Sequence, residues 1–121
     1  MKVSKHSAEH YTWGGECDGW HLLKDDNLAV IQERMPPGTS EVRHYHENAR
    51  QFFFVLAGEV CVETEGETIT LAPHEGVYVR PGITHKVLNR SGTDSEFLVV
   101  SSPSTRGDRV AVETKAAEPI G

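Results

Sequence analysis

Turn-forming residues divide this chain into short apolar segments. Glycine, proline and aspartate recur about every ten residues, and the segments between them are rich in valine, leucine and phenylalanine. No stretch keeps the apolar period of a helix through several turns. Short strands separated by regular turns are typical of sandwiches and barrels, so the sequence predicts an all-β fold.

The chain has room for one domain. Its 121 residues suffice for one hydrophobic core. We expect an N-terminal arm over residues 1–19, a barrel over 20–102, and a loosely held, small and charged tail over 103–121. The arm is expected to pack on the outside of the domain or on a second subunit.

The charge balance and the cysteines limit the partners and the compartment. The chain has 12 basic and 18 acidic residues and a net charge of -6, which provides no basic footprint for nucleic acid or for an anionic membrane. It has no apolar run of signal-peptide or transmembrane length. Cys17 and Cys61 lack metal-binding or disulfide spacing. We therefore expect a cytoplasmic protein, in which the triplet Arg106, Gly107, Asp108 matches an adhesion signal by chance.

Two histidines in the middle of the chain stand on one face of an expected strand. His44 and His46 are separated by one residue, and alternate side chains of an extended strand share a face. A second strand begins at Gln51 and directs Gln51, Phe53 and Val55 to one face, while the intervening residues are apolar as well. A strand that is apolar on both faces is expected inside the fold.

These residues belong to a candidate ligand set of three histidines and a glutamine. The candidates are His44, His46, Gln51 and His85, because imidazole binds divalent first-row metals well and an amide oxygen is a weaker neutral donor. Such a set adds no negative charge, so a bound divalent metal would keep its full charge and attract anions. A six-coordinate metal would keep open positions, which is typical of a catalytic site. The alternative is that the histidines lie on the surface, because a histidine pair is a weak signal by itself.

Two spaced motifs make this ligand set more specific. The first has Gly38, His44 after five residues, His46 after one, Gln51 after four and Gly58 after six. The second runs from Gly76 through Arg80, Pro81, Gly82 and His85 to Asn89. Together they resemble the two motifs of the cupin superfamily, over about residues 28–102. The resemblance implies a small double-stranded β-helix, or jelly-roll barrel, with a metal inside near one mouth.

The chain departs from the usual cupin pattern at the metal and at two turns. Gln51 stands where most metal-binding cupins have glutamate. Arg80 replaces a common proline, and His74 and Glu75 replace a common Gly-Asp step. Some small cupins do coordinate metal through a His, His, Gln, His set, among them enzymes that linearise unsaturated uronates and a prephenate-derived isomerase of antibiotic synthesis. The alternative is a metal-free barrel in which Gln51 marks a lost ligand.

Strand parity and the similarity to cupins predict the pocket. If Gln51 and His85 point inward, the alternate residues of their strands do so too, and the resemblance adds residues of the preceding and last strands. The predicted substrate-binding residues are Ile31, Met35, Phe53, Val55, Val87, Phe97 and Val99. Glu33 is a candidate general base near the metal. The alternative is an outward Glu33 paired with Arg34 or another neighbour.

The function that these residues favour is metal-dependent catalysis on a small anion. One divalent transition metal per chain, Fe, Mn, Ni, Zn or Cu, would stabilise an enolate or alkoxide, which suits isomerase, tautomerase or lyase chemistry on a sugar acid or keto acid. Two alternatives stay open: a non-heme metal dioxygenase, and a non-catalytic cupin that binds a small ligand. The resemblance also implies a homodimer joined by edge strands or arms.

Overall fold

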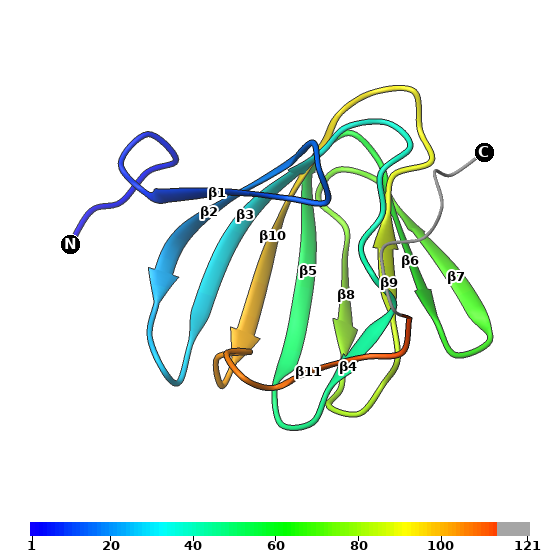
Figure 1. Cartoon of the computed structure of the whole chain (residues 1–121). Helices are drawn as coiled ribbons and strands as arrows, with labels where there is room; N and C mark the ends of the chain where they lie inside the picture. The colour runs from blue at the N-terminus through cyan, green and yellow to red at the C-terminus, as the bar shows by residue number, and fades with distance from the viewer. Residues whose placement is uncertain (114–121) are drawn as a thin grey trace.

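The computed structural model describes residues 1–113, which form eleven strands and no helix (Figure 1). The strands are β1 (Glu9–Trp13), β2 (Cys17–Lys24), β3 (Ala29–Met35), β4 (His44–His46), β5 (Arg50–Ala57), β6 (Val60–Thr64), β7 (Glu67–Leu71), β8 (Gly76–Val79), β9 (Lys86–Leu88), β10 (Ser95–Ser102) and β11 (Arg109–Ala111). The all-β prediction is confirmed. Accordingly, no helix in residues 1–113 is long and apolar enough to cross a membrane.

The strands are arranged in one large sheet and two smaller ones. The large sheet has the order β1-β2-β3-β10-β5-β8, the three-stranded sheet has the order β7-β6-β9, and β11 pairs with β4. Every strand pairing is antiparallel. In Figure 1 the large sheet faces β6, β7 and β9, with β4 and β11 between them at one end. This arrangement is a double-stranded β-helix, as the resemblance implied.

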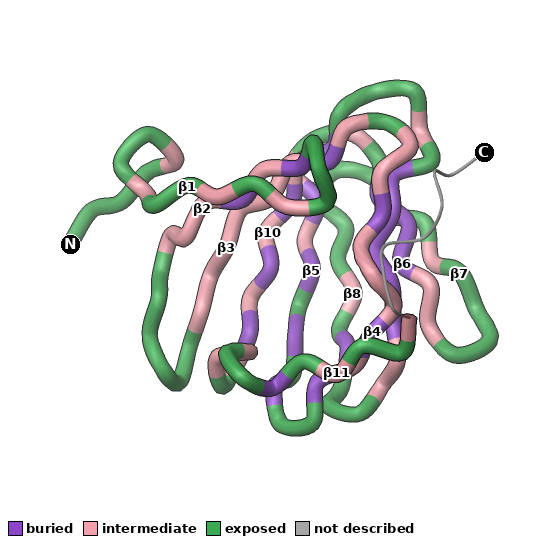
Figure 2. Tube along the Cα trace, viewed as in Figure 1, coloured by how far each residue is buried: buried purple, intermediate pink, exposed green. Residues whose placement is uncertain are grey.

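Burial alternates along β5 and β10, which are neighbours in the large sheet. Phe53 and Val55 of β5 and Phe97 and Val99 of β10 are buried and belong to one apolar core. Figure 2 shows the buried segments of these strands in purple. The expectation that β5 would be covered on both faces is wrong, since Phe52 is 41% exposed. Among residues 1–113 only the inner face of the large sheet has a second layer, so the side-chain period of two determines which residues are buried.

Both ends of the described chain contribute strands to the fold. β1 pairs with β2 from Glu9 opposite His21 to Trp13 opposite Cys17, at the edge of the large sheet. β11 pairs with β4, with Arg109 opposite His46. We expected an arm before residue 20 and a tail after residue 102. Both segments contain a strand, because β2 offers backbone partners to β1 and β4 offers them to β11. The division of the chain at these residues stays a prediction, and residues 114–121 lie outside the described part.

Candidate metal centre

The structure brings the three predicted histidines together. His44 and His46 lie on β4, His85 lies just before β9, and one ring nitrogen of each lies within 4.8 Å of the others. The two motifs are joined through the backbone, because the His44 N–H donates to the His85 carbonyl at 3.0 Å and the His85 N–H donates to the His44 carbonyl at 2.8 Å. The three residues are 1–5% exposed, which excludes the surface alternative. They form a group that could hold a metal.

Two of the imidazoles are held in a defined tautomer. The His44 Nδ1 lies 2.6 Å from the Val42 carbonyl oxygen, and the His85 Nδ1 lies 2.9 Å from the Ile83 carbonyl oxygen. A carbonyl only accepts hydrogen bonds, so each Nδ1 carries the proton and each Nε2 keeps its lone pair. Backbone carbonyls commonly orient metal-binding histidines in this way.

Burial keeps the three imidazoles neutral. It lowers the pKa of His44 to about 3 and the pKa of His46 to about 4, and it also lowers the pKa of His85. The guanidinium of Arg109 lowers all three pKa values further. Neutral imidazole is the form that binds a metal, so no proton has to leave before the lone pairs become available.

Gln51 offers a fourth neutral donor. Its side-chain N–H donates to the Ser101 hydroxyl at 3.1 Å, which leaves the amide oxygen without a hydrogen-bond partner in residues 1–113. His46 Nδ1 and His85 Nε2 are also buried without a partner in this part of the chain. Buried polar atoms are rarely left unsatisfied, and the Gln51 amide oxygen and the His85 Nε2, free acceptors within residues 1–113, fit a divalent metal. The donor set therefore fits the group that the sequence predicts, while coordination by Gln51 stays a prediction.

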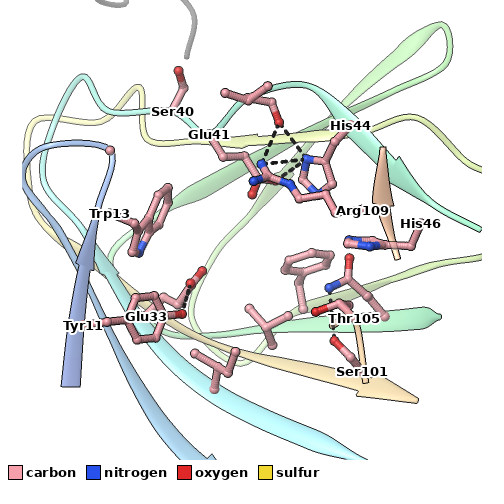
Figure 3. Close-up of a pocket in the computed structure, with 16 residues that line it drawn as sticks. Tyr11, Trp13, Glu33, Ser40, Glu41, His44, His46, Ser101, Thr105 and Arg109 are labelled. Atoms are coloured by element: carbon pink, nitrogen blue, oxygen red, sulfur yellow. Dashed lines mark hydrogen bonds and ion pairs between the residues drawn. The ribbon is translucent and has the colours of Figure 1, made fainter. Parts of the chain in front are cut away.

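A cavity of about 320 Å³ opens beside this centre (Figure 3). Of the residues predicted for the site, His44, His46, Gln51, Ile31, Glu33, Phe53 and Val99 line it. The remainder of the wall consists of Tyr11, Trp13, Gly14, Ser40, Glu41, Val42, Ser101, Thr105 and Arg109. The cavity thus has apolar, aromatic, acidic and basic parts. Three of the four candidate metal ligands line it, whereas His85 is not among the described residues that line it.

Four residues predicted to bind substrate lie elsewhere, in the packed core: Met35, Val55, Val87 and Phe97. Each is at most 1% exposed, and none belongs to the cavity wall. The alternation of side chains along each strand directs them inward as expected. They lie, however, in the part of the interior that side chains of the facing sheets fill completely. Their surroundings are those of core residues, and only Ile31, Phe53 and Val99 of the predicted set line the cavity.

Glu33 lies in the cavity wall and is held there by a tyrosine of β1. The Tyr11 hydroxyl donates to the Glu33 carboxyl at 2.8 Å. In the sheet register Gly19 stands between them, opposite Tyr11 on one side and opposite Glu33 on the other. A Cβ at Gly19 would collide with the Tyr11 ring, so the glycine lets the tyrosine reach across β2. Arg34 pairs with Asp18 instead, and the outward alternative for Glu33 is not observed.

The surroundings of Glu33 bring its ionisation into the neutral range. Burial raises the pKa of Glu33 to about 7, against the opposing effects of the Tyr11 hydrogen bond and the Arg109 charge. Glu41 lies in the same cavity, where burial, reinforced by Glu33, raises its pKa to about 8. A carboxyl group with a pKa near 7 can both accept and release a proton at neutral pH, which is what a general acid or base requires.

Several wall residues were not anticipated from the sequence. Tyr11 and Trp13 come from the segment expected to be an outer arm, and Arg109 comes from the expected tail. Isolated aromatics in a polar segment are a weak hint of a buried role. No local pattern marks Glu41 or Arg109, since both reach the cavity through pairing with distant parts of the chain.

Comparison with known proteins identifies the family. The cupin domain matches residues 31–101. The oxalate-binding protein of Thermotoga maritima is 32% identical over 91 residues, which cover 71% of this chain and 75% of that protein. Quercetin 2,3-dioxygenase of Bacillus subtilis is 31% identical over 61 residues, 50% of this chain and 18% of the enzyme. Two further curated relatives, the tetracenomycin polyketide synthase protein TcmJ of Streptomyces glaucescens and an oxidoreductase of Arthrobotrys oligospora, are covered to 46% and 38% of their length.

The fold is shared with solved structures at low identity. The polyketide cyclase RemF of Streptomyces resistomycificus superposes with a TM-score of 0.81 at 20% identity, over 95% of this chain and 87% of the cyclase. At this identity the likeness concerns the fold alone. With the family match over most of the barrel and both motif histidine sets in one buried group, the chain belongs to the cupin family.

Proposed function

We propose that this cupin is a metal-dependent enzyme that moves a proton on a small anionic molecule, such as a sugar acid or keto acid, in an isomerase, tautomerase or lyase reaction. One observation carries the proposal: two histidines of the candidate metal centre, His44 and His46, line the same cavity as Glu33, a carboxyl group with a pKa of about 7. The cavity volume of about 320 Å³ lies at the small end of the range for ligand pockets, which suits a small organic acid.

The ligands proposed for a divalent transition metal are His44, His46, Gln51 and His85. Such a metal would supply Lewis acidity, undiminished by anionic ligands, toward a substrate oxygen. Glu33 accepts or returns the substrate proton through the carboxyl oxygen that Tyr11 does not hold. Ile31, Phe53 and Val99 form the apolar wall of the cavity. The carbon skeleton of the substrate lies against this wall, which excludes water from it.

The test is proton exchange measured by NMR in deuterium oxide with a panel of sugar acids and keto acids. Wild type should carry about one equivalent of Fe, Mn, Ni, Zn or Cu by elemental mass spectrometry and exchange a carbon-bound proton of at least one compound. Glu33→Gln should keep the metal and lose exchange by about a hundredfold or more. His85→Ala and Gln51→Ala should lose both, with folding checked by circular dichroism.

The exposed His6→Ala serves as a matched control and should behave as wild type. Full exchange in folded Gln51→Ala and His85→Ala would exclude the proposal. So would a wild-type protein that takes up no metal even after reconstitution, since a ligand-binding barrel with vestigial histidines would then remain.

Two other functions are each supported by a relative. The partial match to quercetin 2,3-dioxygenase favours an oxygenase, for which oxygen uptake with an iron- or copper-loaded protein is the separating measurement. The match to an oxalate-binding protein favours a module that holds a small anion, for which tight binding without product is the sign. Proton exchange without oxygen uptake distinguishes the leading proposal from both.

We further propose a homodimer and a cytoplasmic location. β1 is at the edge of the large sheet, and unpaired edges invite pairing with another chain. The buried free thiols of Cys17 and Cys61 suit a reducing compartment. Sedimentation velocity tests the dimer directly.

A further inference from the structure

One cationic side chain lines the cavity. Arg109 on β11 is the only lysine or arginine in the wall as the described residues form it. Arg34 and Arg43 form ion pairs with carboxylates, whereas Arg109 forms none with any residue of 1–113, although Glu33 and Glu41 lie in the same cavity. A guanidinium offers five N–H donors, so most of its hydrogen-bonding capacity is free.

The two polar contacts that Arg109 does make leave this capacity unused. Its guanidinium donates to the Val42 carbonyl at 3.4 Å, a long contact, and lies 3.3 Å from the His44 Nδ1. Because that Nδ1 already donates its proton to the Val42 carbonyl at 2.6 Å, the Arg109–His44 contact joins two donors and is not a hydrogen bond. Arg109 is exposed, so its remaining N–H groups are open to solvent and to a ligand, beside the ring of a candidate metal ligand.

The backbone holds Arg109 over the cavity. β11 pairs with β4 so that Arg109 is opposite His46, and directly opposite residues of an antiparallel pair share a face. The preceding residue fixes the strand, since the Asp108 carboxylate accepts from the backbone N–H groups of Glu47, Asn48 and Ala49 at 2.8–3.1 Å. Figure 3 shows Arg109 between Glu41 and His44, across the cavity from Tyr11 and Glu33.

We propose that Arg109 binds the carboxylate of the substrate and thereby selects small organic carboxylates for the cavity. The planar fork of a guanidinium matches the two oxygens of a carboxylate. The neutral amide of the same acid lacks the charge and the second acceptor oxygen that the guanidinium would bind. The bound carboxylate would accept hydrogen bonds from the open N–H groups of Arg109 beside His44, with its substituent toward Glu33. The proposal rests on the proposed function only in taking this cavity as the substrate site.

The test is a binding titration by calorimetry, made with metal-loaded protein and with chelator-treated protein. The probes are oxalate, pyruvate and benzoate, and their neutral amides. Wild type should bind at least one carboxylate and bind the matching amide much more weakly. R109Q should lose roughly 10- to 100-fold in carboxylate affinity, R109K should retain part of it, and metal content should stay unchanged. R106Q is the matched control on the same segment, since Arg106 is exposed and lies outside the cavity wall.

Three results would overturn the assignment: wild-type affinity in R109Q, equal affinity for carboxylates and their amides, or no carboxylate binding by wild type up to millimolar concentrations. The Arg109 side-chain N–H signal in an NMR spectrum, which should shift when a carboxylate binds to wild type, checks the contact directly. Carboxylate binding that depends on Arg109 without proton exchange would uphold this inference and refute catalysis. Proton exchange in R109Q with unchanged carboxylate affinity would uphold catalysis and refute this inference.

Discussion

The two ends of the barrel interior are built from the same strands but are filled differently. Along β5, Gln51 and Phe53 line the cavity while Val55 is fully buried in the core, and along β10 the change comes between Val99 and Phe97. One end is closed by apolar packing between the sheets. The other is walled by polar side chains and by strands from both ends of the described chain. Parity along a strand therefore determines which face is inward but not how deep the cavity extends.

The difference has a physical cause in what fills each end. At the closed end, valine and leucine side chains of β6 and β7 pack against β5 and β10. At the open end, the inward residues include imidazoles, carboxyl groups and an amide, whose polar atoms must be satisfied and cannot be packed as hydrocarbon is. A cavity remains where such groups converge.

The largest effect is expected from removing matched phenylalanines at the two ends. Phe97 and Phe53 have ring centroids 6.4 Å apart, but only Phe53 lines the cavity. Phe→Ala in a core costs about 3–5 kcal/mol. Phe97→Ala should fall near the top of that range because it opens a void in packed core. Phe53→Ala should fall near the bottom because its ring already faces open space. Urea unfolding of both variants measures the difference, and equal losses would refute the distinction between the ends.

The stability of the open end should depend instead on the carboxylate of Asp108. Asp108→Asn keeps one acceptor oxygen but places an N–H₂ group against backbone donors, so we expect a loss of about 1–3 kcal/mol at pH 7. Asp94→Asn is the control, since Asp94 forms an exposed ion pair with Arg34 and such pairs contribute about 1 kcal/mol or less. Urea unfolding as a function of pH provides the measurement.

The pH dependence gives this prediction a sign. Burial opposes ionisation of Asp108, but the backbone N–H groups of Ala49, Asn48 and Glu47 outweigh it and hold the pKa of Asp108 below its usual value. Its stabilisation is therefore present above the ordinary aspartate pKa and disappears as the pH falls through the lower folded value. Wild type and Asp108→Asn should converge in acid. A constant difference down to the lowest pH would show that the carboxylate charge is not responsible.

The same contrast explains how much the sequence could predict. His44, His46 and His85 could be grouped because motif spacing and strand parity are local properties, and the barrel followed from turn spacing. Arg109 and its neighbour Asp108 could not be anticipated, because their contacts with β4 and the loop after it join residues about sixty positions apart. No pattern in one sequence reports such pairing. The triplet that contains Asp108 matched an adhesion signal by chance. The Asp108 carboxylate nevertheless holds in place the strand that carries Arg109.

Glu33 lies between these cases, and it provides the prediction with the smallest expected effect. The sequence left its direction open, since the alternation in β3 is ambiguous, and the structure resolves it through Tyr11 and the gap at Gly19. The charged and titratable groups that interact with Glu33 are Tyr11, Arg109, Glu41 and the thiol of Cys17. Of these, Tyr11 and Arg109 lower the pKa of Glu33, so Tyr11→Phe should raise it by about 1.

Carbon-13 NMR of the Glu33 carboxyl group, recorded on metal-free protein, measures this pKa. Gly19→Ala should have the same effect as Tyr11→Phe, because the added Cβ displaces the ring while the hydroxyl is retained. Tyr78→Phe, an exposed tyrosine on the outer face, should have none. The folded pKa exceeds that of free glutamate, so the native state binds more protons between about pH 4.5 and 7, and stability should fall as the pH rises through that interval. In Tyr11→Phe this decline should continue to higher pH. If the Glu33 pKa is the same in both variants as in wild type, the tyrosine of β1 closes the cavity without tuning the acid.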